Sequence, residues 1–390
     1  MKISNKSCTG CGLCSLVCPV NCIAMKEDSK GEVIPIVDKD KCINCKKCKT
    51  ECPQNNMPET VIPGKCYVAW SKNKEDLELS ASGGVATVVA RKQLKQKEMF
   101  YGCDYDDDIS LKHFCVNNQD DIERVRSSKY SQSNAYECFL DIKKNLDDRK
   151  RVVFIGTPCQ VSALKRFVHN NINLITIDLV CHGTPPTRYL KEHIEHLKIT
   201  NPECIRFRGQ YDQKLTLWKN CIVQYKKDWQ EDSYFKAFYD NSISRDSCYS
   251  CQYACAGRVG DITLADFWGL GKLKKLNAYN TRPSLVLLNS QRGIDYFELV
   301  KEDLYYEERD VSEGIAGNGR LNKPPGKGDN AYIFQYLYSY LGFEKTLKVV
   351  DTYMAIKKRA MLINKLIKKV IKRVKKIVRN RIIWLKGKLK

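Results

Sequence analysis

The amino-acid sequence predicts a protein of mixed α+β and α/β class in three parts. A small cysteine-rich α+β module comes first, an α/β domain with a parallel βαβα core follows, and a basic amphipathic helix ends the chain. Three observations lead to this prediction. Cysteines are regularly spaced within residues 8–52, two buried strands each precede a helix within 151–197, and apolar residues recur at helical spacing after residue 355. At 390 residues the chain is long enough for two to three domains.

The N-terminal cysteines form two ladders with the same spacing, C-x2-C-x2-C-x3-C-P. The first ladder is Cys8, Cys11, Cys14 and Cys18, and the second is Cys42, Cys45, Cys48 and Cys52. In this spacing three successive thiolates hold one iron–sulfur cubane and the fourth crosses to another. The sequence therefore predicts a complete two-cluster 4Fe-4S ferredoxin module over residues 1–60. One cluster takes Cys8, Cys11, Cys14 and Cys52, and the other takes Cys42, Cys45, Cys48 and Cys18.

Two other uses of eight cysteines are less favoured. A disulfide scaffold requires an oxidising compartment, but residues 1–12 contain no apolar core of ~7 or more residues that would mark a signal peptide. Zinc ribbons pair two C-x2-C units and have no use for a third Cys followed by Cys-Pro. With 20 Cys in the chain, a reducing, low-oxygen cytoplasm is expected.

The net charge of +21 is concentrated at the C-terminus. Residues 355–390 carry 15 of the 66 Lys and Arg and no Asp or Glu, so the body is only mildly basic. Because the body has no matching basic excess, nucleic acid is not an expected partner. No run of ~18 apolar residues occurs, so no simple membrane-spanning helix is predicted.

Residues 66–150 are predicted to form the N-terminal part of the second domain, after a Pro- and Gly-containing linker over 55–64. A strand over 66–70 is followed by Ser80-Ala-Ser-Gly-Gly84, which opens a helix. Bare N–H groups at such a helix start can hold a phosphate, although an ordinary capped helix is the simpler interpretation. Residues 99–103 and 111–116 then predict a hairpin. The hydroxyls and cations of 126–133 suit either a pyrophosphate or a solvated turn.

Residues 151–330 begin with the predicted βαβα core. Strand 151–156 leads into helix 161–168, and strand 174–180 leads into helix 189–197. These strands should be parallel neighbours, so both end at the same edge of the sheet, where ligands bind in open α/β sheets. Cys159 and Cys181 lie just past the two strand ends. Core filler would put these cysteines inside the strands, and therefore cluster ligation is the favoured interpretation.

A loop further along the chain supplies Cys248-x2-Cys251 and a spare Cys255. Two thiolates from this loop and two from the strand ends complete one more cubane. The predicted set is Cys159, Cys181, Cys248 and Cys251, with Cys255 as the substitute. A zinc site on Cys248, Cys251, Cys255 and one distant ligand is the alternative.

Together these segments resemble the family of the beta subunit of coenzyme F420-reducing hydrogenase and formate dehydrogenase. The matching pieces are Ser-Gly-Gly at 82–84, Ser-Lys-Tyr at 128–130, Gly-Thr-Pro-Cys-Gln at 156–160, Asp-Leu-Val-Cys-His-Gly at 178–183, the C-x2-C at 248, and Gly-Asp-Ile-Thr with Asp-Phe-Trp-Gly within 260–269. The resemblance covers about residues 66–330, and Ser127 stands where Gly is common in the family.

The resemblance implies a flavoprotein that holds FAD beside a 4Fe-4S cluster. The flavin-site residues that it implies are Ser82, Gly83, Gly84, Ser128 and Lys129. Lys129 and His182 are the candidate catalytic residues, and His182, which adjoins Cys181, would hydrogen-bond the flavin or a substrate. His113, His169, His193 and His196 have no partner pattern, and the last two are expected on a helix surface.

The expected function is an iron–sulfur flavoprotein oxidoreductase. Electrons would pass from the ferredoxin clusters through the third cluster to FAD and then to a hydride acceptor, either a deazaflavin coenzyme or an organic substrate, for example in surface-polysaccharide metabolism. One alternative is an electron-transfer subunit that has no substrate of its own and serves a partner enzyme. A zinc-stabilised membrane scaffold is a third and less favoured class.

The tail over 331–390 is predicted to be helical. Its apolar residues recur at steps of four and three: Ile356, Ala360, Ile363, Ile367, Val370, Val374, Ile377 and, less regularly, Leu385. The opposite face is almost pure Lys and Arg, which suits a helix lying on an anionic membrane surface with Trp384 as an interfacial anchor. A partner helix or an acidic protein surface is the alternative. The chain is thus expected in the cytoplasm, at the inner face of the membrane if the tail binds there.

Overall fold

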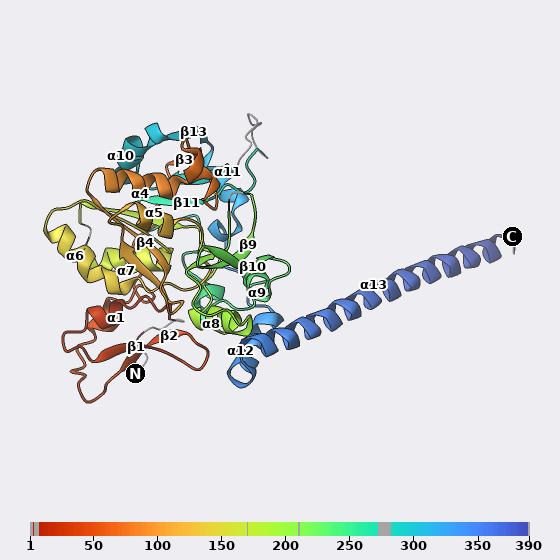
Figure 1. The fold of residues 1–390 in the computed structure, drawn as a ribbon. Helices are drawn as coiled ribbons and strands as arrows, with labels where there is room; N and C mark the ends of the chain where they lie inside the picture. The colour runs from red at the N-terminus through yellow and green to blue at the C-terminus, as the bar shows by residue number, and fades with distance from the viewer. Residues whose placement is uncertain (1–2, 4–7, 170, 210, 272–281, 389–390) are drawn as a thin grey trace.

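A computed structural model describes residues 3, 8–169, 171–209, 211–271 and 282–388, with the backbone alone at 376–388. Figure 1 shows three parts. The cysteine-rich module lies at one end of a larger sheet domain, and a long helix projects away from both. This arrangement agrees with the predicted mixture of α+β and α/β structure.

The N-terminal module is built from two similar halves. Strands β1 (Ile23–Glu27) and β2 (Val33–Val37) pair antiparallel, and β2 falls on the strand predicted between the ladders. The short helices α1 (Leu13–Leu16) and α2 (Lys47–Thr50) carry the third cysteine of each ladder. The residue before each helix, Gly12 or Lys46, has a left-handed backbone conformation. The repeat in the sequence therefore appears as a repeat in backbone geometry.

Residues 65–309 form one eight-stranded sheet in the order β13-β3-β12-β11-β7-β6-β4-β5. The strands are β3 (Lys65–Ser71), β4 (Met99–Tyr105), β5 (Leu111–Cys115), β6 (Val152–Gly156), β7 (Leu174–Leu179), β11 (Ile262–Asp266), β12 (Ser284–Leu288) and β13 (Leu304–Arg309). Strands β4, β6, β7 and β11 are parallel to their neighbours in that series, whereas the other pairings are antiparallel. The predicted parallel core of β6 and β7 and the predicted β4–β5 hairpin are both present.

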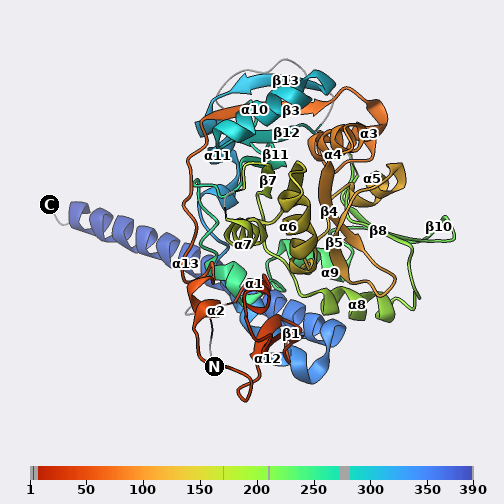
Figure 2. The ribbon, with the colours of Figure 1, turned by 90° about the vertical axis from the view of Figure 1, so that its left-hand side faces the viewer.

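Helices cover both faces of this sheet. Val153 of β6 packs on the face covered by α4 and α10, while Val152 and Phe154 pack on the face covered by α6 and α7. This alternation is the two-residue period of a strand buried on both sides. The helices of this domain are α3 (Lys74–Glu78), α4 (Val85–Lys95), α5 (Gln119–Val125), α6 (Phe139–Asp147), α7 (Pro158–Val168), α10 (Gln291–Val300) and α11 (Val311–Gly317). In Figure 2 the module lies directly below α7.

A second layer of structure flanks the sheet and roots the tail. Its own apolar core brings together α8, α9, α12, the start of α13 and a three-stranded sheet. The elements are α8 (Thr187–His196), β8 (Cys204–Arg206), β9 (Lys214–Lys219), β10 (Ile222–Asp228), α9 (Ser233–Tyr239), α12 (Asp329–Leu341) and α13 (Phe343–Lys388). Short 3-10 turns span Tyr136–Cys138, Asp246–Ser250, Lys301–Asp303 and Gly319–Leu321. Only the first turns of α13 pack on this core, so the remainder of the helix extends into solvent (Figure 1).

His193 fastens the root of α13, and the prediction of a surface position for it was wrong. It is 2% exposed, and its two ring nitrogens contact Glu344 Oε1 at 2.6 Å and Asp232 Oδ2 at 2.9 Å. Burial lowers the pKa of His193, but the two carboxylates raise it to about 9. The imidazole is therefore charged at neutral pH and links α8, α9 and α13. Its partners are 39 and 151 residues away in sequence, and therefore no local pattern reveals them.

We expect His193→Gln to lower the free energy of unfolding by about 3 kcal/mol at pH 6.5, because it leaves two buried carboxylates without their cation. The folded-state pKa lies above the unfolded value of about 6.5. The stabilisation is therefore complete below pH 6.5 and is lost as the pH rises through about 9. Anaerobic urea unfolding at pH 6.5 and 9.5 measures the difference, with the exposed His196→Gln as control. An equal loss at both pH values would contradict this account.

Candidate functional site

The eight ladder cysteines line two pockets in the module. Pocket A is lined by Cys8, Cys11, Cys14 and Cys52. Pocket B is lined by Cys18, Cys42, Cys45 and Cys48. Each pocket thus receives three cysteines from one ladder and the fourth from the other. This is the crossed grouping that the spacing predicts for two cubanes.

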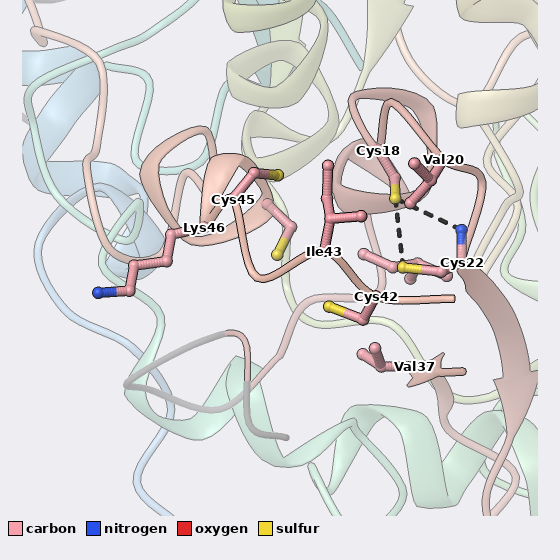
Figure 3. A pocket seen from close by; sticks show the side chains of 10 residues that line it. Cys18, Val20, Cys22, Val37, Cys42, Ile43, Cys45 and Lys46 are labelled. Atoms are coloured by element: carbon pink, nitrogen blue, oxygen red, sulfur yellow. Dashed lines mark hydrogen bonds between the residues drawn. The ribbon is translucent and has the colours of Figure 1, made fainter. Parts of the chain in front are cut away.

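Pocket B is shown from close by in Figure 3, where the side chains of Cys18, Cys42 and Cys45 surround a space closed by Val20 and Ile43. The structure adds Cys22, which the ladder pattern does not include. Its Sγ lies 3.4 Å from Cys18 Sγ, and its backbone N–H donates to that same sulfur at 3.4 Å. A backbone N–H from Gly10 likewise donates to Cys8 Sγ at 3.3 Å in pocket A. Such N–H···S bonds tune the reduction potential of a cluster.

The pockets suit a group larger than one metal ion. Over residues 3, 8–169, 171–209, 211–271 and 282–388, no set of three or more Cys, His, Asp or Glu side chains converges closely enough to hold a single ion. A zinc ion needs its thiolates at about 2.3 Å from one centre. A cubane, in contrast, takes each thiolate at a separate corner, so its four sulfurs stand further apart.

The module is fixed to the sheet domain by long-range hydrogen bonds. Arg166 of α7 donates to the backbone carbonyls of Glu51, Asn56 and Thr50 at 3.0–3.1 Å. Gln252 donates to the carbonyl of Pro53 at 2.9 Å. Gly12 approaches the body so closely that a Cβ there would lie 2.1 Å from the ring of Tyr136. Because backbone carbonyls serve as acceptors, the contact holds the module in one orientation.

A third set of cysteines lies at the carboxyl edge of the parallel strands. We refer to Cys159, Cys181, Cys248 and Cys251 as group C. Cys159 follows β6 at the start of α7, where Thr157 and Gln160 form a capping box and Pro158 occupies the first turn. Cys181 follows β7, and the other two belong to the loop around 246–251. The two strand ends therefore present thiols at one edge, as the βαβα pattern predicts.

The loop and the strand ends come together in group C. A Cβ on Gly183 would lie 3.5 Å from Cys248 Cβ, and Thr184 N–H donates to Cys248 Sγ at 3.5 Å. Cys159 and Cys251 pack against the same apolar core. Burial raises the pKa of Cys159 well above its usual value, and the thiols of Cys251, Cys181 and Cys248 add to this rise. The four thiols of group C are therefore mutual neighbours.

Cys255, the substitute in the sequence prediction, makes local contacts. Its Sγ donates to the carbonyls of Gln252 at 3.6 Å and Gly257 at 3.4 Å. Arg258, which follows, donates to Asp178 Oδ1 at 2.8 Å and joins the loop to β7. Both members of this ion pair are at most 1% exposed at the side chain. These contacts favour Cys251 over Cys255 as the fourth member of group C.

The segment Ser82-Gly83-Gly84 lies between β3 and α4. A Cβ on Gly83 would lie 2.2 Å from the Ala69 carbonyl oxygen, so the backbone approach requires Gly at this position. Gly84 has a φ of 76° and begins the eleven-residue α4. Ser82 Oγ lies 2.8 Å from Ser284 Oγ. These contacts explain the sequence Ser-Gly-Gly structurally and leave its flavin role a prediction.

Ser128 and Lys129 are reached through an ion pair between Asp76 and Arg126. Asp76 Oδ1 accepts from Arg126 Nη2 at 2.5 Å, and Asp76 lies beside Gly84. Lys129 Nζ donates to the carbonyls of Arg124 and Arg126 at 2.6 Å, and burial lowers its pKa. Ser127 adopts a φ of 67°, a left-handed conformation for which Gly is favoured. A catalytic role for Lys129 would require its amine to leave these carbonyls.

His182 is exposed and lies next to group C through Cys181. Burial of its surroundings lowers its pKa, and the charge of Arg320 lowers it further. Arg208 also contributes to this lowering, and it pairs with Asp266 at 2.6 Å. The imidazole of His182 is therefore neutral at pH 7 and able to accept or donate one hydrogen bond. Trp268, two residues after Asp266, is 46% exposed.

Comparison with known proteins identifies both parts of the chain. Residues 7–56 match the 4Fe-4S dicluster domain, and residues 149–314 match the family described as the C terminus of the beta subunit of coenzyme F420 hydrogenase/dehydrogenase. The chain belongs to the F420 hydrogenase/dehydrogenase beta subunit family. Its N-terminal dicluster domain carries two 4Fe-4S clusters. This member of the family is therefore an iron–sulfur electron-transfer protein of the oxidoreductase type.

The individual relatives are similar over limited parts. A ferredoxin-like protein in the nif region of Sinorhizobium fredii is 38% identical over 68 residues, which are 16% of this chain and 94% of that protein. The B component of the Na+-translocating ferredoxin:NAD+ oxidoreductase complex of Acetobacterium woodii is 41% identical over 56 residues, which are 14% of this chain and only 15% of that component. A chain of the F420-reducing [NiFe] hydrogenase complex of Methanosarcina barkeri aligns with 17% identity and a TM-score of 0.45, over 76% of this family member and 94% of that chain.

Proposed function

We propose that this chain passes electrons from its two ferredoxin clusters, through a third 4Fe-4S cluster held by group C, to FAD and on to a hydride acceptor. The acceptor is a deazaflavin coenzyme or an organic substrate, for example in surface-polysaccharide metabolism. FAD, when bound, takes up electrons singly and delivers them in pairs as hydride. The observation that carries the proposal is the spatial order of pocket B, pocket A and group C.

Pocket B provides the entry point. Cys45 is exposed and Ile43 beside it is 61% exposed, so an external redox partner protein can approach this pocket. Pocket A follows at once, because Cys14 of pocket A lies close enough to Cys48 of pocket B for the second thiol to raise the pKa of the first. Cysteines of both pockets also pack in one small apolar cluster.

Group C is next after pocket A. Cys11 of pocket A and Cys159 of group C pack in the same apolar core as Tyr253. Burial raises the pKa of Tyr253, and the nearby thiols of Cys159 and Cys11 add to the rise. Because Tyr253 is 3% exposed, the space between the two cysteine groups excludes water. Adjacent buried clusters in series are what one-electron transfer requires.

The chain's own residues fit an FAD site in part. The start of α4 at Gly84 offers free N–H groups for a phosphate, while Ser128 and Lys129 lie near it through the Asp76–Arg126 pair. His182 would hydrogen-bond the flavin or the substrate beside group C. Asp76 places a negative charge near the helix start, but Arg126 and Arg91 neutralise it through hydrogen bonds at 2.5 Å.

Cofactor analysis of the anaerobically purified chain tests this function. We expect about 12 Fe per chain, the content of three cubanes, together with FAD released on denaturation. About 8 Fe would rule out the third cluster, and zinc at group C would replace it by the zinc alternative. A chain with 12 Fe and no flavin would instead be an electron-transfer subunit without a substrate of its own.

We also propose that α13 binds an anionic membrane surface. Over the described residues no helix is long and apolar enough to cross a membrane. The predicted apolar stripe is on the helix surface, with Ile356, Ile363, Ile367, Val370 and Val374 each at least half exposed. The side chains of Ile377, Trp384 and Leu385 lie outside the described residues. An exposed apolar stripe beside a basic face is the pattern of an interfacial helix.

Deletion of residues 355–390 should abolish binding to vesicles that contain phosphatidylserine and leave the visible spectrum unchanged. The double variant Ile363→Glu and Ile367→Glu, which keeps every basic residue, should weaken binding by at least tenfold, because each buried aliphatic side chain contributes about 1.5–3 kcal/mol. Vesicle flotation measures both, with phosphatidylcholine vesicles as control. Undiminished binding after the deletion would contradict the proposal.

A further inference from the structure

Arg245 occupies the junction between the ferredoxin module and the sheet domain. It is 1% exposed and ranks among the largest fully buried side chains over the described ranges. Its Nη2 donates to the backbone carbonyls of Cys8 at 3.1 Å and Val33 at 3.0 Å, and its Nη1 donates to Gln132 Oε1. Gln132 in turn donates to the Thr9 carbonyl at 3.0 Å. One arginine of the body thus grips two segments of the module.

The same side chain adjoins group C. Arg245 lies three residues before Cys248, whose backbone N–H donates to the Arg245 carbonyl at 3.0 Å. Burial raises the pKa of both Cys8 and Cys248, and the charge of Arg245 acts on each in the opposite direction. Arg245 is therefore within electrostatic range of one cysteine of pocket A and one of group C.

The charge of Arg245 is only loosely compensated. Glu32 Oε2 is 3.7 Å from Nη2, and Glu32 Oε1 accepts the backbone N–H of Asp246 at 2.8 Å. Arg245 Nε is buried and has no hydrogen-bond partner over the described residues. A buried guanidinium with an unused donor costs free energy, and a purely structural anchor would not need it. Retention of such a charge at this junction points to an electrostatic role.

We propose that Arg245 is a positioning residue for electron transfer, which docks the ferredoxin module and places one fixed positive charge between the clusters of pocket A and group C. The group C half of this proposal rests on the proposed function. Each transfer moves one electron from the first cluster to the second, and the redox partner protein supplies it. No bond forms or breaks in this step.

The sign of the effect follows from the charge change on reduction. A cluster that gains an electron becomes more negative, so a positive charge nearby stabilises its reduced form and raises its reduction potential. The effect is large only where water is excluded, because buried charges are weakly screened. Arg245 acts on both clusters at once and therefore keeps their potentials matched. Glu32 acts in the opposite direction on the same two clusters.

Redox titration monitored by electron paramagnetic resonance tests the proposal on the anaerobic holoprotein. We expect Arg245→Gln to lower the potentials of the pocket A and group C clusters. The shift should be about tenfold in the reduced-to-oxidised ratio, which is about 59 mV for one electron. Arg245→Lys should keep potentials near those of wild type, and Glu32→Gln should raise them. Signals are assigned by difference with Cys45→Ala for pocket B and Cys159→Ala for group C.

Arg166→Gln is the matched control, because Arg166 also grips module carbonyls but its side chain is 24% exposed and more screened. It should leave all potentials unchanged. Unchanged potentials in Arg245→Gln, or equal shifts in the Lys and Gln variants, would overturn the proposal. Should Arg245→Gln fail to retain iron, the upward shift in Glu32→Gln decides. If the wild type holds about 8 Fe, the third cluster fails separately and pocket A alone tests Arg245.

Discussion

Replacement of Cys52 by Ala should remove the cluster held by the first ladder and leave the cluster of its own ladder intact. Cys52 lines pocket A together with Cys8, Cys11 and Cys14, whereas its ladder partners line pocket B. A cubane that loses one of four thiolates is no longer fully held, so the iron content should fall by about 4 per chain. The loss occurs although 34 residues separate Cys52 from the matching position Cys18.

Double variants show which cluster has been lost. With crossed ligands, Cys52→Ala combined with Cys45→Ala damages both pockets, so about 8 Fe should be lost. Cys52→Ala combined with Cys11→Ala damages pocket A alone and should lose about 4 Fe. Iron analysis of the anaerobically purified variants gives both numbers. The reverse result, with the larger loss in the Cys11 combination, would mean that each ladder holds its own fourth ligand.

Replacement of Cys159 by Ala should have the second large effect. It removes one member of group C at the start of α7, so about 4 Fe should be lost while both ferredoxin clusters remain. Electrons from the module would then have no neighbouring acceptor. We expect reduction of the bound flavin by a reduced ferredoxin-type donor to slow by at least about a thousandfold, equivalent to about 4 kcal/mol in activation free energy.

The control for this prediction is Cys255→Ala. Its thiol contacts the carbonyls of Gln252 and Gly257, so its removal should leave the iron content and flavin reduction rate close to those of wild type. Stopped-flow absorbance under anaerobic conditions follows the flavin and the clusters separately. Loss of iron in Cys255→Ala with full retention in Cys251→Ala would exchange these two residues in the ligand set.

The sequence predicted those features of the fold that depend on local patterns. The cysteine spacing grouped the ladder residues as pockets A and B are lined, because crossed ligation is a property of the spacing itself. The βαβα pattern predicted that β6 and β7 are parallel neighbours, and therefore that Cys159 and Cys181 share one sheet edge. Group C then required only a loop with a C-x2-C unit.

Residues whose partners lie far away in sequence were beyond local reasoning. Arg245 meets Cys8 across 237 positions, and His193 meets Glu344 across 151. Neither contact leaves a periodic signal, because each depends on how separate elements pack. Cys22 is different, since its position four residues after Cys18 was visible in the sequence. The Ser-Gly-Gly segment shows the converse, because close backbone packing at Gly83 explains it without any ligand.

The position of β3 has a consequence for biosynthesis. This strand lies between β12 and β13, so the sheet cannot close until the ribosome has made residue 309. All eight ladder cysteines have emerged long before then, because the last of them is Cys52. Since chains fold from the N-terminus as they are made, the module can receive its iron and sulfide while its docking surface is still missing. Cluster assembly and docking are thereby separated in time, and the scaffold proteins that deliver iron meet an open module.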